Sequence, residues 1–519
     1  MRVALINPSV PAALKKENLG LAYLAACLNQ AGHQTRIIDE IAGHRADQAL
    51  GEFKPDIVGI SFMTMYALRA YELTDRIKRE WGIPVILGGA HATALPDEAI
   101  EHADAIIRGE AEITFPNLLD SGRIEGVVEA QPPTDLDALP MPSRDQLDLN
   151  FYATAGEELA GLSYRTLGVI TSRGCPFHCD FCVNSKREVP LRFHGPGRVI
   201  EEIRYLVQRH HIESIAFYDE LMATNRERFA AICEQMIAND LNHLRWECQI
   251  HPRALRDDLL PLMKRAGCVQ VAIGFESGSQ RILDRLHKGA NVEQNLEVAR
   301  RVREAGLRLR GCFVFGAPGE TLEDIEKTET FIRAARIDFA SMHYLTPYPG
   351  TALYDQLKDR IAAAHIPWDK FTTGNPDTFP ATTRFLPQSK NTSSKNSPRA
   401  SPSATTPSPT CSAAPSKTPA TPSTSPPNSS DNPNPAVEHR RVKRAHAEGI
   451  GGRRLVGAAG DSGVVTSRVD ARLLLFGLDE FAASWTRPQF CSFTDQPVAA
   501  LSDLAPFRSR ISRRNSAVR

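Results

Sequence analysis

The chain has 519 residues, of which 42% are hydrophobic and 24% charged, and its 61 basic residues balance its 61 acidic residues. This length is too great for one ordinary domain, and the composition is typical of a globular enzyme. A formal net charge of zero gives no support to nucleic-acid binding. The first residues lack the apolar stretch of a secretory signal, and no run of 18 apolar residues could span a membrane, so a cytoplasmic location is expected.

Short apolar runs alternate with amphipathic stretches over the first 130 residues. Helical periodicity is clear at 20–31 and 66–81. The predicted strands are 3–7, 35–39, 56–61, 84–89 and 105–108. This alternation predicts a doubly wound (Rossmann-like) α/β domain over residues 1–130, with a parallel sheet covered by helices on both faces.

Ligands of doubly wound domains bind at the carboxyl ends of the strands. Here those ends carry glycines, which allow a ligand to approach the backbone, and hydroxyl side chains that can form hydrogen bonds. No G-x-G-x-x-G follows the first strand, which disfavours a dinucleotide site. Taken alone, these features are weak, because strand-ending glycines often serve only turns.

A proline-containing connector is predicted over residues 131–164, and a second alternating series follows over residues 165–375. Its helical stretches are 199–209, 226–238, 291–305 and 322–335. Its predicted strands are 167–171, 214–218, 245–250, 269–275, 309–315 and 340–345. Six strand–helix units fit an open relative of the TIM barrel or another doubly wound sheet, and periodicity does not distinguish the two.

Three cysteines, Cys175, Cys179 and Cys182, follow the first strand of this second series. Three thiolates can ligate three irons of a [4Fe–4S] cubane and leave the fourth iron open. The main alternative is zinc, for which the only nearby additional ligands are His178 and His194. A disulfide framework is disfavoured in a long chain with 10 unevenly spread cysteines.

The spacing C-x3-C-x2-C, with the aromatic Phe181 before the last cysteine, resembles the signature of the radical S-adenosylmethionine (SAM) superfamily. The resemblance implies that SAM binds the open iron and that one electron cleaves it to methionine and a 5′-deoxyadenosyl radical. It also implies a partial (β/α)6 TIM-type barrel for residues 165–375. An electron donor such as flavodoxin or ferredoxin is then expected as a partner.

Several residues at the ends of the predicted barrel strands match positions at which this family binds SAM. The acidic pair 219–220 would meet the amino group, although Asp219 could equally cap a helix. The run 274–280 is very similar to the family's run, in which the glutamate lies near the ribose and methionyl part, and the turn 313–321 would flank the adenine. The residues expected to contact this cofactor are Phe181, Asp219, Glu220, Gln249, Glu276, Gly316 and Ala317.

In the first domain, the stretches that begin at Gly20, Gly88 and Gly109 together resemble the cobalamin-binding domain that precedes many radical SAM barrels. The motif Asp-x-His-x-x-Gly, whose histidine ligates cobalt in other cobalamin domains, is absent, so the lower face of cobalt has no assigned ligand. His91 is expected to be a hydrogen-bonding or structural residue more readily than a ligand. The residues expected to contact cobalamin are Asn7, Gly20, Ser61, Thr64, Gly88, Gly89, His91, Thr93, Gly109 and Glu110.

The resemblance implies a cobalamin-dependent radical SAM enzyme that methylates an unactivated carbon of a small molecule such as a lipid, a tetrapyrrole or a natural product. The surroundings of Glu276 also resemble the anaerobic magnesium-protoporphyrin ester cyclases, so ring formation on a tetrapyrrole is an alternative. A non-catalytic cobalamin or iron–sulfur sensor is a third hypothesis, which the set of expected SAM contacts disfavours.

Residues 376–519 form a tail whose segment 390–435 is dominated by Ser, Thr, Pro and Asn. Such a composition cannot bury enough apolar surface to fold, so disorder is predicted. A reading-frame shift and a disordered interaction tail are both compatible with the abrupt change in composition.

Overall fold

The computed structural model describes residues 1–375 without residues 12, 14, 155–157, 160, 161, 187, 188 and 257. The predicted tail, 376–519, therefore lies outside the described residues. The first part of the chain forms a six-stranded sheet in the order β2-β1-β3-β4-β5-β6, with every neighbouring pair parallel. Its strands are β1 (Arg2–Asn7), β2 (Gln34–Asp39), β3 (Ile57–Ser61), β4 (Val85–Gly88), β5 (Ala105–Arg108) and β6 (Gly126–Glu129).

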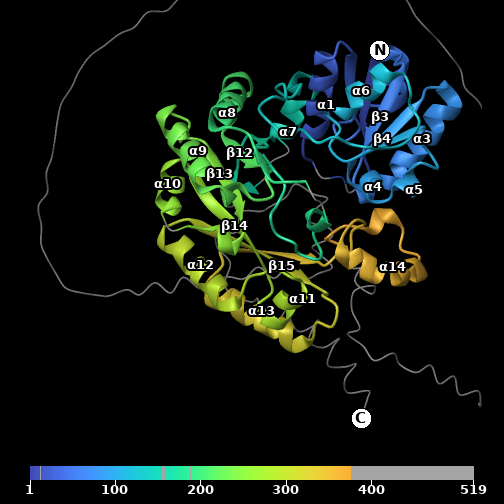
Figure 1. Ribbon diagram of the computed structural model, residues 1–519. Helices are drawn as coiled ribbons and strands as arrows, with labels where there is room; N and C mark the ends of the chain where they lie inside the picture. Colours follow the sequence, from blue (N-terminus) through green and yellow to red (C-terminus); the bar gives the residue numbers. More distant parts are fainter. Residues whose placement is uncertain are drawn as a thin grey trace, which may run out of the picture. The chain divides into compact units, whose positions relative to one another are not determined.

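Successive residues of these strands point to opposite faces of the sheet, and helices cover both faces (Figure 1). Leu5 of β1 packs in a cluster with residues of α1 and α6, whereas the next residue, Ile6, packs in a cluster with residues of α2 and α3. The helices are α1 (Leu19–Gln30), α2 (Ala46–Phe53), α3 (Ala67–Trp81), α4 (Gly89–Ala94), α5 (Pro96–Ala99) and α6 (Thr114–Ser121). The predicted doubly wound domain is confirmed.

The five strands predicted in this domain are present, and β6 was missed. β6 is short, and its residues are exposed or half-buried, so it carries no buried apolar run that a pattern could reveal. The connector that follows contains α7 (Leu149–Thr154), whose residues Tyr152 and Ala153 pack in the same core cluster as α1. Two short strands, β7 (Glu158–Leu159) and β8 (Leu162–Ser163), pair antiparallel after it.

The second part forms another six-stranded parallel sheet, in the order β16-β15-β14-β13-β12-β9. Its strands are β9 (Thr166–Val169), β12 (Ser214–Phe217), β13 (Arg245–Ile250), β14 (Cys268–Glu276), β15 (Arg308–Phe315) and β16 (Phe339–Tyr344). Each strand pairs with the next strand of the series, and the first and last strands, β9 and β16, are the two edges. The sequential order is that of an open (β/α)6 barrel, as the family resemblance implied.

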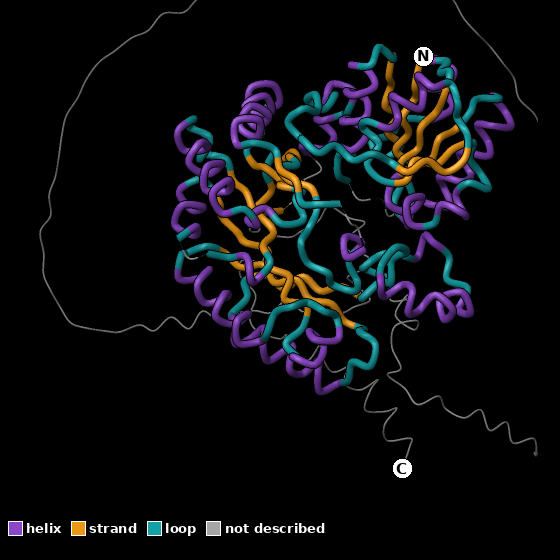
Figure 2. Tube along the Cα trace, viewed as in Figure 1, coloured by secondary structure: helices purple, strands orange, loops and turns teal. Residues whose placement is uncertain are grey.

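Helices separate the strands of this barrel and lie outside them (Figure 2). They are α8 (Pro196–His210), α9 (Arg226–Ala238), α10 (Leu259–Arg265), α11 (Gln280–Arg285), α12 (Val292–Glu304), α13 (Leu322–Ala335) and α14 (Ala352–Ala364). On β13 the buried Trp246, Cys248 and Ile250 belong to the core cluster, while Gln249 between them is exposed. This alternation leaves polar side chains of the strand for the inner side of the barrel.

Short elements lie in the loops that connect the barrel strands and helices or follow the last helix. They are the antiparallel pair β10 (Ser172–Arg173) and β11 (Arg192–Phe193) and the single turns η3 (Val183–Lys186), η4 (Met222–Thr224), η5 (Pro252–Ala254) and η6 (Trp368–Lys370). Because β10 and β11 pair, the two ends of the cysteine-bearing segment between them are held together.

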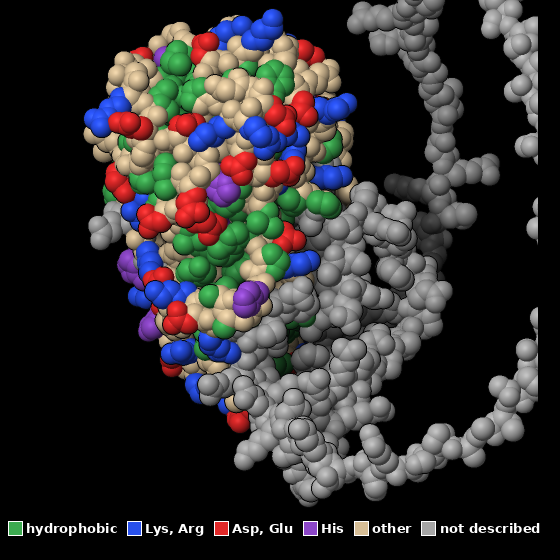
Figure 3. All heavy atoms as spheres, turned by 90° about the vertical axis from the view of Figure 1, so that its right-hand side faces the viewer, with side chains coloured by type: hydrophobic (Ala, Val, Ile, Leu, Met, Phe, Trp, Pro, Cys, Tyr) green, Lys and Arg blue, Asp and Glu red, His purple; other side chains and the backbone are tan. Residues whose placement is uncertain are grey.

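Charges of both signs are interspersed over the face of the molecule seen in Figure 3. A surface of this kind lacks the single-sign stripe expected of a nucleic-acid interface on that face. Among the helices of the described residues, none combines the length and the apolar character needed to cross a bilayer.

Candidate active site at the carboxyl ends of the barrel strands

The cysteine-bearing loop begins directly after β9, and Asp219 fixes its first residues. The carboxylate of Asp219 accepts hydrogen bonds from the backbone N–H of Thr171 at 2.6 Å, from the Thr171 hydroxyl at 2.6 Å and from the Ser172 hydroxyl at 2.5 Å. Burial raises the pKa of Asp219, while the hydrogen bonds from Ser172 and Thr171 oppose that rise. Asp219 is only 3% exposed, and the hydrogen bonds from Thr171 and Ser172 occupy both oxygens of its carboxylate.

The neighbouring carboxylate, Glu220, is placed differently. Its Oε2 accepts a hydrogen bond from the backbone N–H of Gly174 at 3.3 Å, and its Oε1 accepts one from Nδ2 of Asn184 at 3.1 Å. Glu220 lines a cavity of about 210 Å³ that Cys175 also lines. Of the acidic pair, Glu220 is therefore the member that a ligand beside the cysteines could reach.

None of the three cysteines forms a disulfide bond with a residue that the structure describes; Cys179 is buried, and Cys175 and Cys182 are half-buried. Burial raises the pKa of all three thiols, that of Cys179 to about 11. The backbone N–H of Phe177 donates to the Cys175 sulfur and that of Asn184 to the Cys182 sulfur, and each bond lowers the pKa of its thiol. Hydrogen bonds of this kind to the ligand sulfurs are typical of iron–sulfur centres.

The residues fit an open cubane better than a site for a single ion. In the part of the chain that the structure describes, no three His, Cys, Asp or Glu side chains converge as ligands of one metal ion. A cubane does not need such convergence, because each cysteine ligates a different iron. The donor set, three soft thiolates in one loop, matches that cluster.

The middle of the cysteine loop is held by the elements around it. The Phe177 ring stacks on the His251 ring with 3.6 Å between the ring centroids. The backbone N–H of Asp180 donates to the carbonyl oxygen of Leu286 at 3.1 Å, and the N–H of Leu353 donates to the carbonyl oxygen of Asp180 at 2.9 Å. The loop is thereby attached to η5, to the end of α11 and to the start of α14.

His251 and Lys288 connect this contact to the carboxylate of Glu276. The Nε2–H of His251 donates to the backbone carbonyl of Lys288 at 3.1 Å, and Nδ1 of His251 accepts from the N–H of Arg253 at 3.2 Å. Burial and the nearby Lys288 ammonium lower the pKa of His251 to about 4. The ring is thus neutral near neutral pH, with one nitrogen donating and the other accepting.

Lys288 is a residue of the site that the sequence analysis missed. Its Nζ lies 2.8 Å from Oε1 of Glu276, and both residues are 7% exposed. Glu276 has a backbone φ of +62°, a left-handed conformation that is uncommon outside glycine and asparagine and that clusters at functional sites. No periodicity marks Lys288, since it lies in an irregular segment between α11 and α12.

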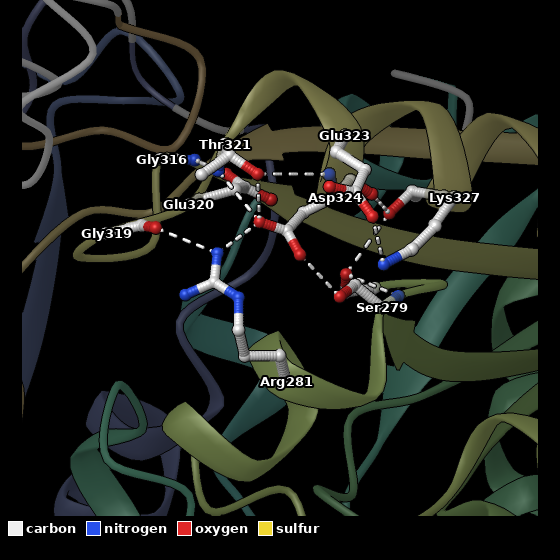
Figure 4. A network of polar contacts seen from close by, with 11 residues as sticks. Ser279, Arg281, Gly316, Gly319, Glu320, Thr321, Glu323, Asp324 and Lys327 are labelled. Atoms are coloured by element: carbon white, nitrogen blue, oxygen red, sulfur yellow. Dashed lines mark hydrogen bonds and ion pairs between the residues drawn. The ribbon is translucent and has the colours of Figure 1, made fainter.

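The loops after β14 and β15, expected to flank SAM, are joined by Asp324 (Figure 4). Oδ1 of Asp324 accepts from the Ser279 hydroxyl at 2.6 Å, and Oδ2 accepts from the N–H of Thr321 at 2.8 Å and from Arg281. The Arg281 guanidinium also donates to the carbonyl oxygen of Gly319 at 2.9 Å. One buried carboxylate at the start of α13 therefore holds both loops.

The loop after β14 packs so closely on α13 that residue 278 must be a glycine. A Cβ at Gly278 would lie 2.5 Å from the carbonyl oxygen of Lys327 and 2.7 Å from Cα of Thr328, both on α13. The backbone N–H of Gly278 donates to the Thr328 hydroxyl at 3.0 Å, and the Ser277 hydroxyl lies 3.1 Å from the same oxygen. The sequence Ser277-Gly-Ser279 thus serves packing on α13 as well as the shape of the loop.

The glycine-rich turn after β15 closes on a buried glutamate. Oε2 of Glu320 accepts a hydrogen bond from the N–H of Gly316 at 2.6 Å, and its Oε1 is buried with no partner among the described residues. Burial raises the pKa of Glu320 to about 7. Ala317 in the same turn is fully buried, so what the turn can offer a ligand is mainly its backbone.

The other two residues expected near SAM lie at the edge of this region. Phe181 is half-buried and packs against the cluster of Ile282, Leu286 and Leu353. Gln249 is exposed on β13, on the side away from the core. Neither lines the 210 Å³ cavity.

A second cavity, of about 220 Å³, lies at the carboxyl ends of the strands of the first domain. Six of the residues expected to contact cobalamin line it: Gly20, Ser61, Gly88, Gly89, Gly109 and Glu110. Gly88 has an extended backbone, and a Cβ there would meet nothing closer than the Ile107 carbonyl oxygen at 3.6 Å. The protein itself would accept a Cβ at position 88, and the glycine leaves that part of the cavity open.

Four residues expected to contact cobalamin do not line this cavity: Asn7, Thr64, His91 and Thr93. Asn7 donates to Asp39 at 2.9 Å, and the Thr93 hydroxyl accepts from the N–H of Gly109 at 3.1 Å. His91 is fully buried, with Nε2 3.3 Å from Oε1 of Glu98 and its ring against Trp368. These contacts with Glu98 and Trp368 are those of a buried residue that stabilises the fold.

The two cavities share three lining residues, Glu110, Ile170 and Arg173. Arg173 lies two residues before Cys175, and its guanidinium donates to Glu110 at 2.9 Å and to Glu112 at 2.6 Å. Arg192 also donates to Glu110, at 2.5 Å. Although burial raises the pKa of Glu110, the hydrogen bond from Arg192 and the charge of Arg173 hold it below its ordinary value.

Comparison with known protein families divides the chain in the same way. The family model described as "Radical SAM superfamily" matches residues 169–332, and that described as "B12 binding domain" matches residues 11–119. The first match begins at the end of β9 and includes the three cysteines.

Among curated proteins, the chain is 32% identical to the uncharacterized methyltransferase PH0819 of Pyrococcus horikoshii, over 72% of this chain and 87% of that protein. It is 30% identical to the anaerobic magnesium-protoporphyrin IX monomethyl ester cyclase of Rubrivivax gelatinosus, over 66% of each chain. Among solved structures, the fold resembles the radical SAM methyltransferase TsrM of Kitasatospora setae with cobalamin and a [4Fe–4S] cluster bound, with a TM-score of 0.56 and 18% identity over 70% of this chain and 78% of that one.

Proposed function

Because this chain belongs to the radical SAM superfamily, in the branch that carries a B12-binding domain, we propose that it transfers a methyl group to an unactivated carbon of a small molecule. Its cofactors are SAM, a [4Fe–4S] cluster and cobalamin. When bound, SAM and the cluster supply a carbon-centred radical, and cobalamin supplies the methyl group.

The observation that carries this proposal is the pair of cavities with a common wall. One is lined by Cys175 and Glu220, the other by Gly88, and Arg173 and Glu110 line both. A substrate held at this wall would be within reach of both groups, as methyl transfer requires. Holding reactants in such an arrangement is the main contribution that a protein makes to cofactor chemistry.

The chain's own residues have distinct tasks in this proposal. Cys175, Cys179 and Cys182 hold the cluster, and Glu276, Glu220 and the backbone around Gly316 hold SAM. Asp219 and Asp324 position the loops that carry these groups, through the hydrogen bonds described above. The apolar wall formed by Leu5, Leu21, Ile86 and Phe115 keeps water away from the cobalamin side.

Anaerobic turnover tests the proposal. Reconstituted protein incubated with SAM and dithionite is expected to form 5′-deoxyadenosine and, with a correct substrate, S-adenosylhomocysteine, both measured by mass spectrometry. Cys179→Ala should lose iron and 5′-deoxyadenosine, whereas Cys268→Ala, a buried core cysteine on β14, should keep both. A wild-type protein with an intact cluster and no 5′-deoxyadenosine would favour the sensor hypothesis.

Oxidative ring formation on a tetrapyrrole is a second candidate, favoured by the 30% identity to the Rubrivivax gelatinosus cyclase. The products distinguish the two reactions. Methyl transfer adds one methylene to the mass of the substrate and releases S-adenosylhomocysteine, whereas cyclisation does neither. Candidate lipids, tetrapyrroles and natural products assayed in parallel would identify the substrate class.

The proposal also requires a source of electrons and a reducing compartment. We expect a small electron-carrier protein, a flavodoxin or a ferredoxin, as the partner. We expect a cytoplasmic location, because thiols that ligate a cluster must stay reduced.

A further inference from the structure

Glu17 is a buried carboxylate of the first domain that contacts the barrel. It lies just before α1 and is only 6% exposed. Its Oε1 accepts a hydrogen bond from the backbone N–H of Gly168 on β9, and its Oε2 accepts one from the hydroxyl of Tyr218 at 3.0 Å. Tyr218 directly follows β12. One side chain from the start of the chain therefore holds the first two strands of the barrel sheet.

The contact with β9 takes the place of a neighbouring strand. β9 is an edge of the barrel sheet, and an edge strand has backbone groups that find no partner within the sheet. Glu17 accepts from the N–H of Gly168, and the guanidinium of Arg144 donates to the carbonyl oxygen of Gly168 at 2.7 Å. Arg144 also pairs with Glu202 on α8, and its Nη1 lies 3.9 Å from Oε1 of Glu17. These buried partners fix the carboxylate of Glu17 against β9.

The ring of Tyr218 is held on several sides. A Cβ at Gly168 would lie 2.6 Å from Cζ of the ring, so the ring can pack on β9 only because this residue is a glycine. The ammonium of Lys16 lies 5.3 Å from the ring centroid, and the backbone N–H of Tyr218 donates to the carbonyl oxygen of Val169 at 2.9 Å. With its hydroxyl bound to Glu17, the side chain of Tyr218 has one well-defined position.

Glu17 connects the walls of the two cavities. Tyr218 lines the 210 Å³ cavity together with Cys175. Gly20 and Leu21, in the first turn of α1, line the 220 Å³ cavity of the first domain. Glu17 itself lines neither cavity, so it can act on a ligand only through these two walls.

We propose that Glu17 is a positioning residue that couples the two cavities, so that a corrinoid bound in one raises the affinity of the other for SAM; the inference rests on the proposed function. A ligand in either cavity orders the wall on its side, and the hydrogen bonds from Gly168 and Tyr218 to Glu17 extend that order to the other wall. The second ligand then loses less conformational entropy when it binds. Because coupling of binding free energies is reciprocal, SAM raises the affinity for the corrinoid by the same factor.

Removal of a single hydroxyl tests the coupling. Tyr218→Phe keeps the ring and loses the hydrogen bond to Glu17. The matched control is Trp368→Phe, which loses the hydrogen bond of 2.9 Å from Nε1–H of Trp368 to Oε1 of Glu98 in the first domain, where neither residue lines a cavity. Cluster-loaded enzyme without a reductant, which cannot cleave SAM, is dialysed anaerobically to equilibrium against hydroxocobalamin, with and without SAM. The ratio of the two dissociation constants for hydroxocobalamin is the coupling factor.

We expect a coupling factor of about five or more in wild type and in Trp368→Phe, and of less than about two in Tyr218→Phe. Glu17→Ala should lose the coupling as well, and Glu17→Ala/Tyr218→Phe should lose no more than either single variant, because the two residues act as a pair. A factor near one in wild type, a wild-type factor in Tyr218→Phe, or an equal loss in Trp368→Phe would overturn the inference. Absence of 5′-deoxyadenosine when dithionite is added to wild type would contradict the proposed function, while the dialysis would still decide the coupling.

Discussion

The ammonium of Lys288 lies 2.8 Å from Oε1 of Glu276, in a buried pair beside the cysteine loop. Burial opposes the charge of Lys288, but the carboxylate of Glu276 raises the pKa of the ammonium above its ordinary value. Removing two charges from water costs about as much as their attraction returns. The presence of this buried pair is therefore better explained by a role in the site beside the cysteine loop than by a contribution to the stability of the fold.

Replacing Lys288 with methionine tests the dependence of Glu276 on its partner. Lys288→Met leaves the carboxylate of Glu276 buried without its cation. We expect the free energy of unfolding of the cluster-free protein to fall by about 3–5 kcal/mol. Anaerobic denaturant titration followed by circular dichroism measures this change.

The double variant Lys288→Met/Glu276→Gln supplies the control. Because it removes both charges, it should be more stable than Lys288→Met alone, and the two single effects should not add. A double variant whose destabilisation equals the sum of the two single effects would show that the residues do not act as a pair. Recovery of stability without recovery of SAM binding would assign the pair to the site.

Gly88 offers a way to fill the cobalamin cavity without disturbing the domain. Its extended backbone accepts other residues, and a Cβ would have only an ordinary contact with the Ile107 carbonyl oxygen. We expect Gly88→Leu to bind hydroxocobalamin at least tenfold more weakly while its free energy of unfolding changes by less than about 1 kcal/mol. Absorbance spectroscopy of the bound corrinoid and thermal unfolding measure the two quantities.

Gly197→Ala on α8 is the matched substitution, because a Cβ there meets nothing within 4 Å and the residue lines neither cavity. It should bind cobalamin as wild type does. Reductive cleavage of SAM should continue in Gly88→Leu, since Cys175 and Glu220 line the other cavity. Wild-type corrinoid binding by Gly88→Leu would place the cobalamin elsewhere.

Asp324 is expected to act on SAM binding through the loops that it joins. Asp324→Asn removes the ion pair with Arg281 and weakens the bonds to Ser279 and Thr321. We expect KM for SAM to rise more than kcat falls, and the free energy of unfolding to drop by about 1–3 kcal/mol. Initial rates of 5′-deoxyadenosine formation with dithionite over a range of SAM concentrations separate the two constants.

Glu323→Gln is a suitable comparison because Glu323 is adjacent and 75% exposed, and its ion-pair partner among the described residues is Lys327, one helical turn away. That variant should keep wild-type KM. If Asp324→Asn lowered kcat alone, the contact between the loops would not be a determinant of SAM binding.

Much of this site follows from patterns in the sequence. The predicted strands of the barrel are present, and the cysteines and Glu276 lie at or just after strand ends. These positions were predictable because hydrophobic periodicity locates a strand and hence the loop that follows it. Which residue of a loop faces a ligand and which one holds the loop in place was not predictable in the same way. Asp219 and Glu220 are adjacent, yet only Asp219 is enclosed. Its hydrogen-bond partner Thr171 lies 48 residues earlier, so the local sequence does not reveal the contact.

Lys288 illustrates the other limit of sequence patterns. Around it, buried and exposed residues alternate in an irregular segment, which does not distinguish an inward-pointing lysine from one in solvent. Its partner Glu276 lies 12 residues earlier, in a left-handed backbone conformation that hydrophobic periodicity does not reveal. Long-range contacts of single polar side chains determined these roles, and they became visible only in the folded structure.

Glu320 makes stability depend on pH in a predictable direction. Burial raises its pKa from 4.5 to about 7, so the fold favours the neutral acid. Its contribution to stability is fully present below pH 4.5 and is lost as the pH rises through about 7. Glu320→Gln stays neutral throughout, so wild type should lose up to about 3 kcal/mol of stability relative to the variant over this interval. Denaturant titrations of both proteins between about pH 5 and 8 measure the difference, in which the other carboxylates cancel. A difference that stays constant with pH would mean that the N–H of Gly316 suffices to hold the ionised carboxylate.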